Sequence, residues 1–93
     1  PCMLYNVPSR TGIKMNFEAV SMLKDHKNLW AIKEASGSTE DFSKYVAAAP
    51  KARVYSGDDA LLSDFCALGC KGLVSVASNV WPILFSLLQT RFL

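Results

Sequence analysis

The chain has 93 residues, of which 51% are hydrophobic and 19% are charged. This composition is typical of a buried globular core and excludes a disordered chain. The formal net charge is +2, and the cations are scattered without a basic run, so neither nucleic acid nor an anionic membrane is an expected partner.

The cysteines and the apolar segments bear on where the protein is located in the cell. Three cysteines, an odd number, favour free thiols, and we expect a cytoplasmic protein because no signal peptide stands at the start. The apolar segment 81–93 is shorter than the roughly 20 residues that span a bilayer, and it predicts a buried helix. The chain enters a strand-like pattern without a leader or initiator methionine, so we expect it to be cut at its front.

The first half of the sequence predicts two strands, each followed by a helix. Apolar residues form the strands Met3–Val7 and Leu29–Ile32 with little polar alternation, as in strands buried on both faces. Asn16 is the expected N-cap of the first helix, which ends in basic residues. Ser38 or Thr39 is the expected N-cap of the second helix, which a proline ends.

The second half repeats this pattern. Arg53–Tyr55 and Leu73–Val76 are the third and fourth predicted strands. Asp58 or Asp59 is the expected cap of the third helix, which stops at a glycine. The fourth helix starts near Pro82 and is apolar almost all round.

The predicted order is therefore βαβαβαβα, in one partial domain of residues 1–93 without a linker. Strands joined by single helices run parallel, because each crossover returns the chain in the same direction. Such a unit fits half of a (β/α)8 barrel or part of a doubly wound sheet. The sequence has no glycine-rich phosphate loop, and this favours the barrel, although a complete one needs roughly 250 residues.

Polar residues at the ends of the predicted strands are the candidate site residues, since active sites of parallel α/β proteins gather there. Lys33 closes the second strand, where desolvation would lower its pKa and make it a nucleophile towards a carbonyl. An ion pair of Lys33 with Glu34 or Asp58 is the alternative. Tyr5 would relay protons or be a core tyrosine, and Arg10 would hold a carboxylate or be a solvated surface residue.

Other candidates have simpler explanations. Cys66 and Cys70 lack a second pair of ligands, so buried thiols are expected and no metal site. Asp58 and Asp59 are explained by a helix cap, although the pair could hold a divalent cation. His26, the single histidine, is expected on the surface, and this leaves a triad hydrolase with little support.

At these positions the sequence resembles the dihydrodipicolinate synthase family of pyruvate-dependent class I aldolases. The segment 5–12, Tyr-Asn-Val-Pro-Ser-Arg-Thr-Gly, resembles its tyrosine motif, and 32–37, Ile-Lys-Glu-Ala-Ser-Gly, resembles its lysine motif. The segments 56–60 and 72–79 resemble its seventh-strand motif and its glycine-led eighth strand. The resemblance implies strands five to eight of a (β/α)8 barrel.

The resemblance also implies roles for four residues. Lys33 would form the imine with pyruvate, Tyr5 would relay protons, Arg10 would hold the carboxylate of aspartate semialdehyde, and the carbonyl of Val74 would border the pyruvate pocket. The implied reaction gives 4-hydroxy-tetrahydrodipicolinate in lysine and diaminopimelate biosynthesis. It needs no metal and no organic cofactor, since the lysine amine is the electron sink.

Two other interpretations stay open. The N-acetylneuraminate lyases and keto-sugar-acid aldolases share the lysine and the tyrosine, although Arg10 favours the synthases. A non-catalytic half-barrel that self-associates through its open strand edges is the other. The family's Gly-Thr-Thr-Gly-Glu segment is absent from the sequence. We therefore expect these residues alone to be inactive and the complete enzyme to be a dimer or tetramer.

Overall fold

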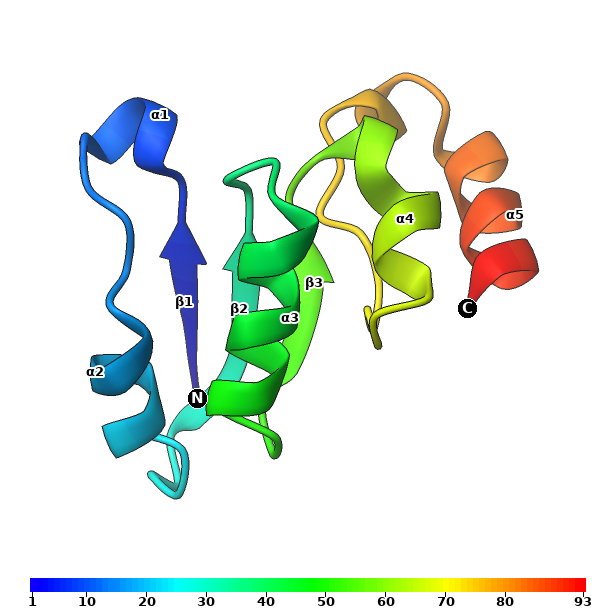
Figure 1. The fold of residues 1–93 in the computed structure, drawn as a ribbon. Coiled ribbons are helices and arrows are strands. Elements are labelled where there is room, and N and C mark those ends of the chain that lie inside the picture. The colour runs from blue at the N-terminus through cyan, green and yellow to red at the C-terminus, as the bar shows by residue number, and fades with distance from the viewer.

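A computed structural model describes all residues from 1 to 93 and contains one parallel sheet. Its strands are β1 (Cys2–Asn6), β2 (Leu29–Glu34) and β3 (Arg53–Ser56), in the order β1-β2-β3 (Figure 1). Helices connect consecutive strands, so the predicted parallel arrangement with helical crossovers is confirmed for these three strands.

Seven helical segments complete the chain. They are α1 (Pro8–Thr11), α2 (Phe17–Met22), α3 (Thr39–Ala48), α4 (Leu62–Cys66), α5 (Pro82–Phe92) and two 3₁₀ turns, η1 (Asp59–Leu61) and η2 (Ala77–Asn79). The predicted caps are confirmed: side-chain oxygens of Asn16, Ser38 and Asp58 accept backbone N–H groups at 3.1, 3.1 and 2.9 Å. The short helix α1 follows β1 directly and carries Arg10.

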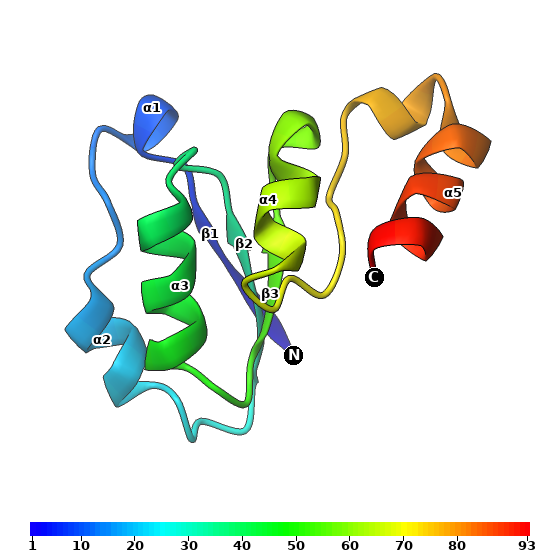
Figure 2. The same ribbon diagram turned by 45° about the vertical axis from the view of Figure 1, so that its right-hand side comes forward.

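The hydrophobic core lies between one face of the sheet and the helices. Figure 2 shows α3 and α4 on the same side of the strands. Ile32 of β2 and Val54 of β3 contribute to the core beneath these helices. Phe42 of α3 and Phe65 of α4 stack with their ring centroids 4.3 Å apart. These aromatic rings join the two helices over the sheet.

The opposite face of the sheet carries no helix, which corrects the prediction of strands buried on both faces. Side chains alternate along a strand, and Lys33 pairs in register with Tyr5 of β1 and Tyr55 of β3. These three residues define what we call the open face. Tyr5 retains 42% of its exposure there.

The predicted fourth strand, Leu73–Val76, is wrong as an element. It makes a single parallel bridge, between Leu73 and Ser56, and the Val74 N–H donates to the carbonyl of Ser56 at 2.9 Å. No strand lies on its far side, and the chain turns at once into η2, where the Ser75 hydroxyl accepts the N–H of Ser78. The segment runs parallel to β3 but has no strand on its other side to pair with.

The helix predicted to be buried at 81–93 is instead exposed. None of the residues of α5 is buried, and Ile83 and Leu87 keep 77% and 63% of their exposure. Figure 1 shows α5 beside α4, with no element on its outer side. Ile83, Leu84, Leu87 and Phe92 therefore face solvent in this chain, whereas Phe85 and Leu88 are half-buried. No helix of the structure combines the length and the apolar character that a bilayer crossing requires.

Candidate functional site

The structure brings Lys33 and Tyr5 together at the carboxyl ends of two neighbouring strands. They are register partners in β1 and β2, and the Lys33 Nζ lies 4.0 Å from the centroid of the Tyr5 ring. A cation over an aromatic face gains about 0.5–2 kcal/mol, depending on its exposure. The lysine amine and a phenol thus share one site on the open face.

The alternative interpretation of Lys33, an ion pair with Glu34 or Asp58, is wrong. The three ion pairs of the structure are Lys14–Asp41, Lys44–Glu40 and Lys51–Asp25. Glu34 follows Lys33 in the strand and therefore points to the helix-covered face. The carboxylate of Asp58 caps η1 instead. The half-buried lysine therefore has an aromatic neighbour and no carboxylate partner.

Gly57, just after β3, packs against the stem of the lysine. A Cβ added at Gly57 would lie 3.0 Å from Lys33 Cε and 2.8 Å from Ala35 Cβ. The Gly57 N–H donates to the carbonyl of Glu34 at 2.8 Å, which holds the two strand ends at this separation. Because Gly57 has no side chain, the Lys33 stem can lie against the end of β3.

The two predicted substrate-binding residues are Arg10, which follows β1, and Val74, which follows β3. Arg10 is exposed in the last turn of α1, and its guanidinium forms no hydrogen bond or ion pair within the chain. Val74 lies beside the end of β3 and is 37% exposed. Arg10 has no polar side-chain partner, whereas the Val74 N–H is bonded to Ser56, and neither residue is part of the Lys33–Tyr5 contact.

The other candidates have structural roles. The Asp59 carboxylate accepts the N–H of Ala77 at 3.2 Å and joins η1 to η2. Burial raises the pKa of the Cys66 thiol, and the thiol of Cys70 donates to the carbonyl of Gly72. All three cysteines are free, as predicted. His26 is exposed, also as predicted.

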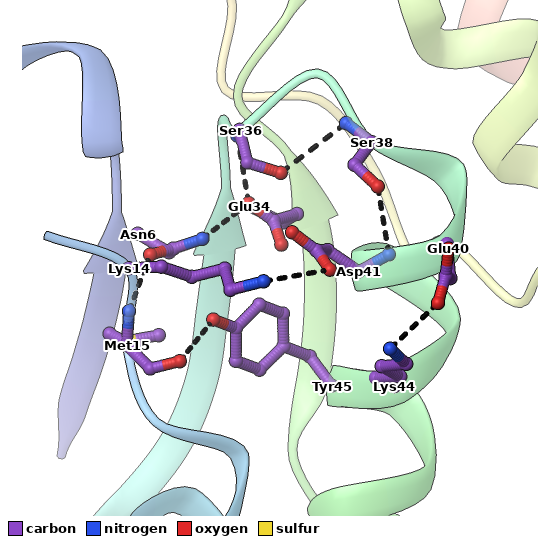
Figure 3. Close-up of polar contacts among 10 residues, drawn as sticks. All are labelled: Asn6, Lys14, Met15, Glu34, Ser36, Ser38, Glu40, Asp41, Lys44 and Tyr45. Carbon is purple, nitrogen blue, oxygen red and sulfur yellow. Dashed lines mark hydrogen bonds and ion pairs between the residues drawn. The ribbon is translucent and has the colours of Figure 1, made fainter.

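A buried polar pair next to the site was not assigned from the sequence. Figure 3 shows Asn6 donating to Glu34; the Nδ2–Oε1 distance is 2.8 Å, and the two side chains are 1% and 0% exposed. The Glu34 Oε1 also accepts the N–H of Ser36 at 2.8 Å, whereas its Oε2 is buried without a partner. The sequence signal for this pair was Glu34 itself, a charged residue directly after the lysine at the end of an otherwise apolar strand.

The burial of Glu34 predicts a pH dependence of stability. Burial raises the pKa of this carboxyl above its ordinary value of 4.5, and Asn6 and Ser36 offset the rise in part. The folded chain then holds a proton that the unfolded chain has lost, so stability falls as the pH rises from about 4.5 through the folded pKa. Glu34→Gln is expected to raise the melting temperature at pH 8 and to flatten this slope. Circular-dichroism melts of the chain between pH 4 and 8 measure it, and an unchanged slope would contradict the assignment.

The chain resembles known synthases over most of its length. A model of the dihydrodipicolinate synthetase family matches residues 1–90. The 4-hydroxy-tetrahydrodipicolinate synthase of Francisella philomiragia is 56% identical over 82 residues, which are 88% of this chain and 28% of that protein. The chain therefore spans little more than a quarter of the length of this relative.

Solved structures agree with this similarity. The dihydrodipicolinate synthase of Aquifex aeolicus matches 99% of this chain and 32% of its own with a TM-score of 0.93 and 34% identity. A chloride-inhibited synthase of Acinetobacter baumannii, solved with pyruvate, matches the same shares with a TM-score of 0.90 and 33% identity. Sequence and fold agree, and the chain belongs to the dihydrodipicolinate synthetase family.

Proposed function

We propose that these residues are the lysine-bearing part of a 4-hydroxy-tetrahydrodipicolinate synthase, which condenses pyruvate with aspartate semialdehyde through an imine on Lys33. The observation that carries the proposal is the Lys33–Tyr5 pair on the open face, 4.0 Å from Nζ to ring centroid, with no carboxylate on the amine. The 56% identity to a synthase supports the choice of reaction.

The chemistry follows from the two groups. The free amine of Lys33 adds to the C2 carbonyl of pyruvate and forms a carbinolamine, which loses water to give the imine. The Tyr5 phenol donates a proton to the departing hydroxyl and takes protons back in later steps. Loss of a methyl proton gives an enamine, which adds to the aldehyde carbon. The lysine nitrogen accepts the electrons, so the reaction requires no cofactor or metal.

Two further residues complete the proposal. Arg10 is exposed without an internal partner, so its guanidinium can hold the carboxylate of the aldehyde substrate in a bidentate geometry. This arginine favours the synthase over the N-acetylneuraminate lyases and keto-sugar-acid aldolases. The backbone carbonyl of Val74 borders the site of pyruvate from the side of β3.

The proposed place of the chain in a complete (β/α)8 barrel is strands five to eight with their helices. The order of the four family motifs supports this place, as do the single-sided sheet and the exposed α5, which another part of a barrel would cover. The residues alone are then inactive, because the rest of the pyruvate pocket lies elsewhere. A cytoplasmic homo-oligomer is the proposed complete form, and the free cysteines fit a reducing compartment.

The test uses a complete barrel. In the Francisella philomiragia synthase, the segment that matches this chain is replaced by the present sequence, which we call the barrel chimera. Pyruvate followed by borohydride is expected to add one reduced pyruvyl group to the peptide that contains Lys33, as measured by mass spectrometry. The unaltered relative serves as the control for trapping. A folded chimera without an adduct on Lys33 contradicts the proposed chemistry, and a chimera that does not fold contradicts the proposed placement.

A further inference from the structure

We propose that Asn6 and Glu34 act as positioning residues for the reaction: their side chains form a buried strut that holds the ends of β1 and β2 together and so keeps Tyr5 against Lys33. The inference rests on the proposed function, since it concerns the same lysine. It assigns a role to two buried residues whose side chains lie on the helix-covered side of the sheet, away from the open face.

The strut lies one register position beyond the catalytic pair. Tyr5 pairs with Lys33, and Asn6 pairs with Glu34. At this last rung, the backbone bond from the Ala35 N–H to the Asn6 carbonyl, at 2.9 Å, is joined by the side-chain bond from Asn6 Nδ2 to Glu34 Oε1, at 2.8 Å. Strand ends fray more readily than strand centres. The side-chain hydrogen bond at this last register pair therefore limits separation of β1 from β2 next to Tyr5 and Lys33.

The same two side chains fix the loops that leave the strands. Asn6 Oδ1 accepts the N–H of Met15 at 3.0 Å, and the carbonyl of Met15 accepts the hydroxyl of Tyr45 at 2.6 Å (Figure 3). Burial raises the pKa of the Tyr45 phenol, so this phenol stays a donor. The loop between Asn6 and Met15 carries Arg10, and both of its ends are therefore tied to the strut.

Glu34 also links the second strand to the third. The Glu34 side chain accepts the N–H of Ser36, where the chain turns towards α3. The backbone carbonyl of Glu34 accepts the N–H of Gly57 at 2.8 Å. Gly57 in turn touches the Lys33 stem from the side of β3. Three strand ends around the lysine are thus connected through one buried residue.

The energetics argue against a purely stabilising role. Glu34 is fully buried, no cation pairs with it, and its Oε2 has no hydrogen-bond partner. A buried group with an unsatisfied oxygen destabilises the fold, whereas an apolar pair of the same size would fill the space without this penalty. The hydrogen bond between Asn6 and Glu34 instead fixes the relative position of the two strand ends. This matters because a catalytic pair is sensitive to displacements of about 1 Å.

The test measures the rate constant of adduct formation in the barrel chimera with pyruvate, by rapid quenching into borohydride. In such an experiment the amplitude reports the folded fraction and the rate constant reports the geometry of the site. Glu34→Ala and Asn6→Leu are expected to lower the rate constant about tenfold or more. Glu34→Gln keeps the acceptor oxygen and is expected to stay within about twofold of the parent. Glu40→Gln, an exposed change on α3, is the matched control.

The outcomes separate the strut from the proposed function. A parent chimera that forms no adduct contradicts the function itself. A parent that forms it, with Glu34→Ala and Asn6→Leu equally fast, contradicts the strut alone. A lower amplitude with an unchanged rate constant would show a role in folding only, and would also overturn the inference. A loss in Glu34→Gln as large as in Glu34→Ala would contradict the hydrogen bond as its basis.

Discussion

Lys33→Met is expected to abolish the pyruvate adduct of the barrel chimera and to lower kcat by at least about a thousandfold. Methionine has nearly the length of lysine but no amine, so the nucleophile is removed while the stem still packs against Gly57. Because Lys33 has no ion-pair partner, the change leaves no buried carboxylate unpaired, and the melting temperature should stay close to that of the parent.

The matched control is Lys44→Met. This lysine pairs with Glu40 on the exposed side of α3, and that helix covers the other face of the sheet. It changes the same charge and the same side-chain volume away from the site, so adduct formation should be unaffected. An adduct that persists in Lys33→Met and vanishes in Lys44→Met would refute the assignment of the nucleophile.

Gly57→Ala is the second change with a large expected effect. The new Cβ would lie 2.8 Å from Ala35 Cβ and 3.2 Å from the Glu34 carbonyl oxygen, both parts of a rigid strand end. The strands must separate to admit it, which costs about 1–3 kcal/mol. The Lys33 stem, 3.0 Å from the same Cβ, must move too. We expect the rate constant of adduct formation to fall about tenfold or more, as a displacement near 1 Å implies.

A double mutant separates crowding from other effects of the alanine. Ala35→Gly removes the nearest obstacle, so Gly57→Ala/Ala35→Gly should recover part of the lost melting temperature and part of the lost rate. Purely additive effects of the two changes, measured by thermal melts and quenched-flow trapping, would show that the clash with Ala35 is not the cause.

The elements predicted correctly are those fixed by local sequence. Asn16, Ser38 and Asp58 cap helical turns because each needs only N–H groups two or three residues ahead. Leu73–Val76 and α5 differ, because these residues contain no second strand beside the segment and no layer over the helix. Secondary-structure propensity indicates which conformation a segment favours, but it does not indicate whether a strand or helix is present for the segment to pack against.

The site divides in the same way. Neighbouring parallel strands that both end in polar residues predict that Tyr5 and Lys33 meet, and the register confirms this. The hydrogen bond of Glu34 with Asn6 could not be predicted, because the two residues lie 28 positions apart in the sequence and meet only through the register of the strands. The fit of Gly57 against the lysine stem depends on distances of a few tenths of an ångström, which no residue pattern encodes.

The bareness of the open face has a consequence for mutational tolerance. In these 93 residues the buried core lies on the helix-covered side, so side chains such as Tyr5 on the opposite face contribute little to folding. A screen of the isolated chain for solubility or protease resistance would therefore find these positions freely replaceable. In the proposed complete barrel these positions would be constrained by the reaction, so a folding selection on this segment would miss the residues to which the proposed chemistry assigns a role.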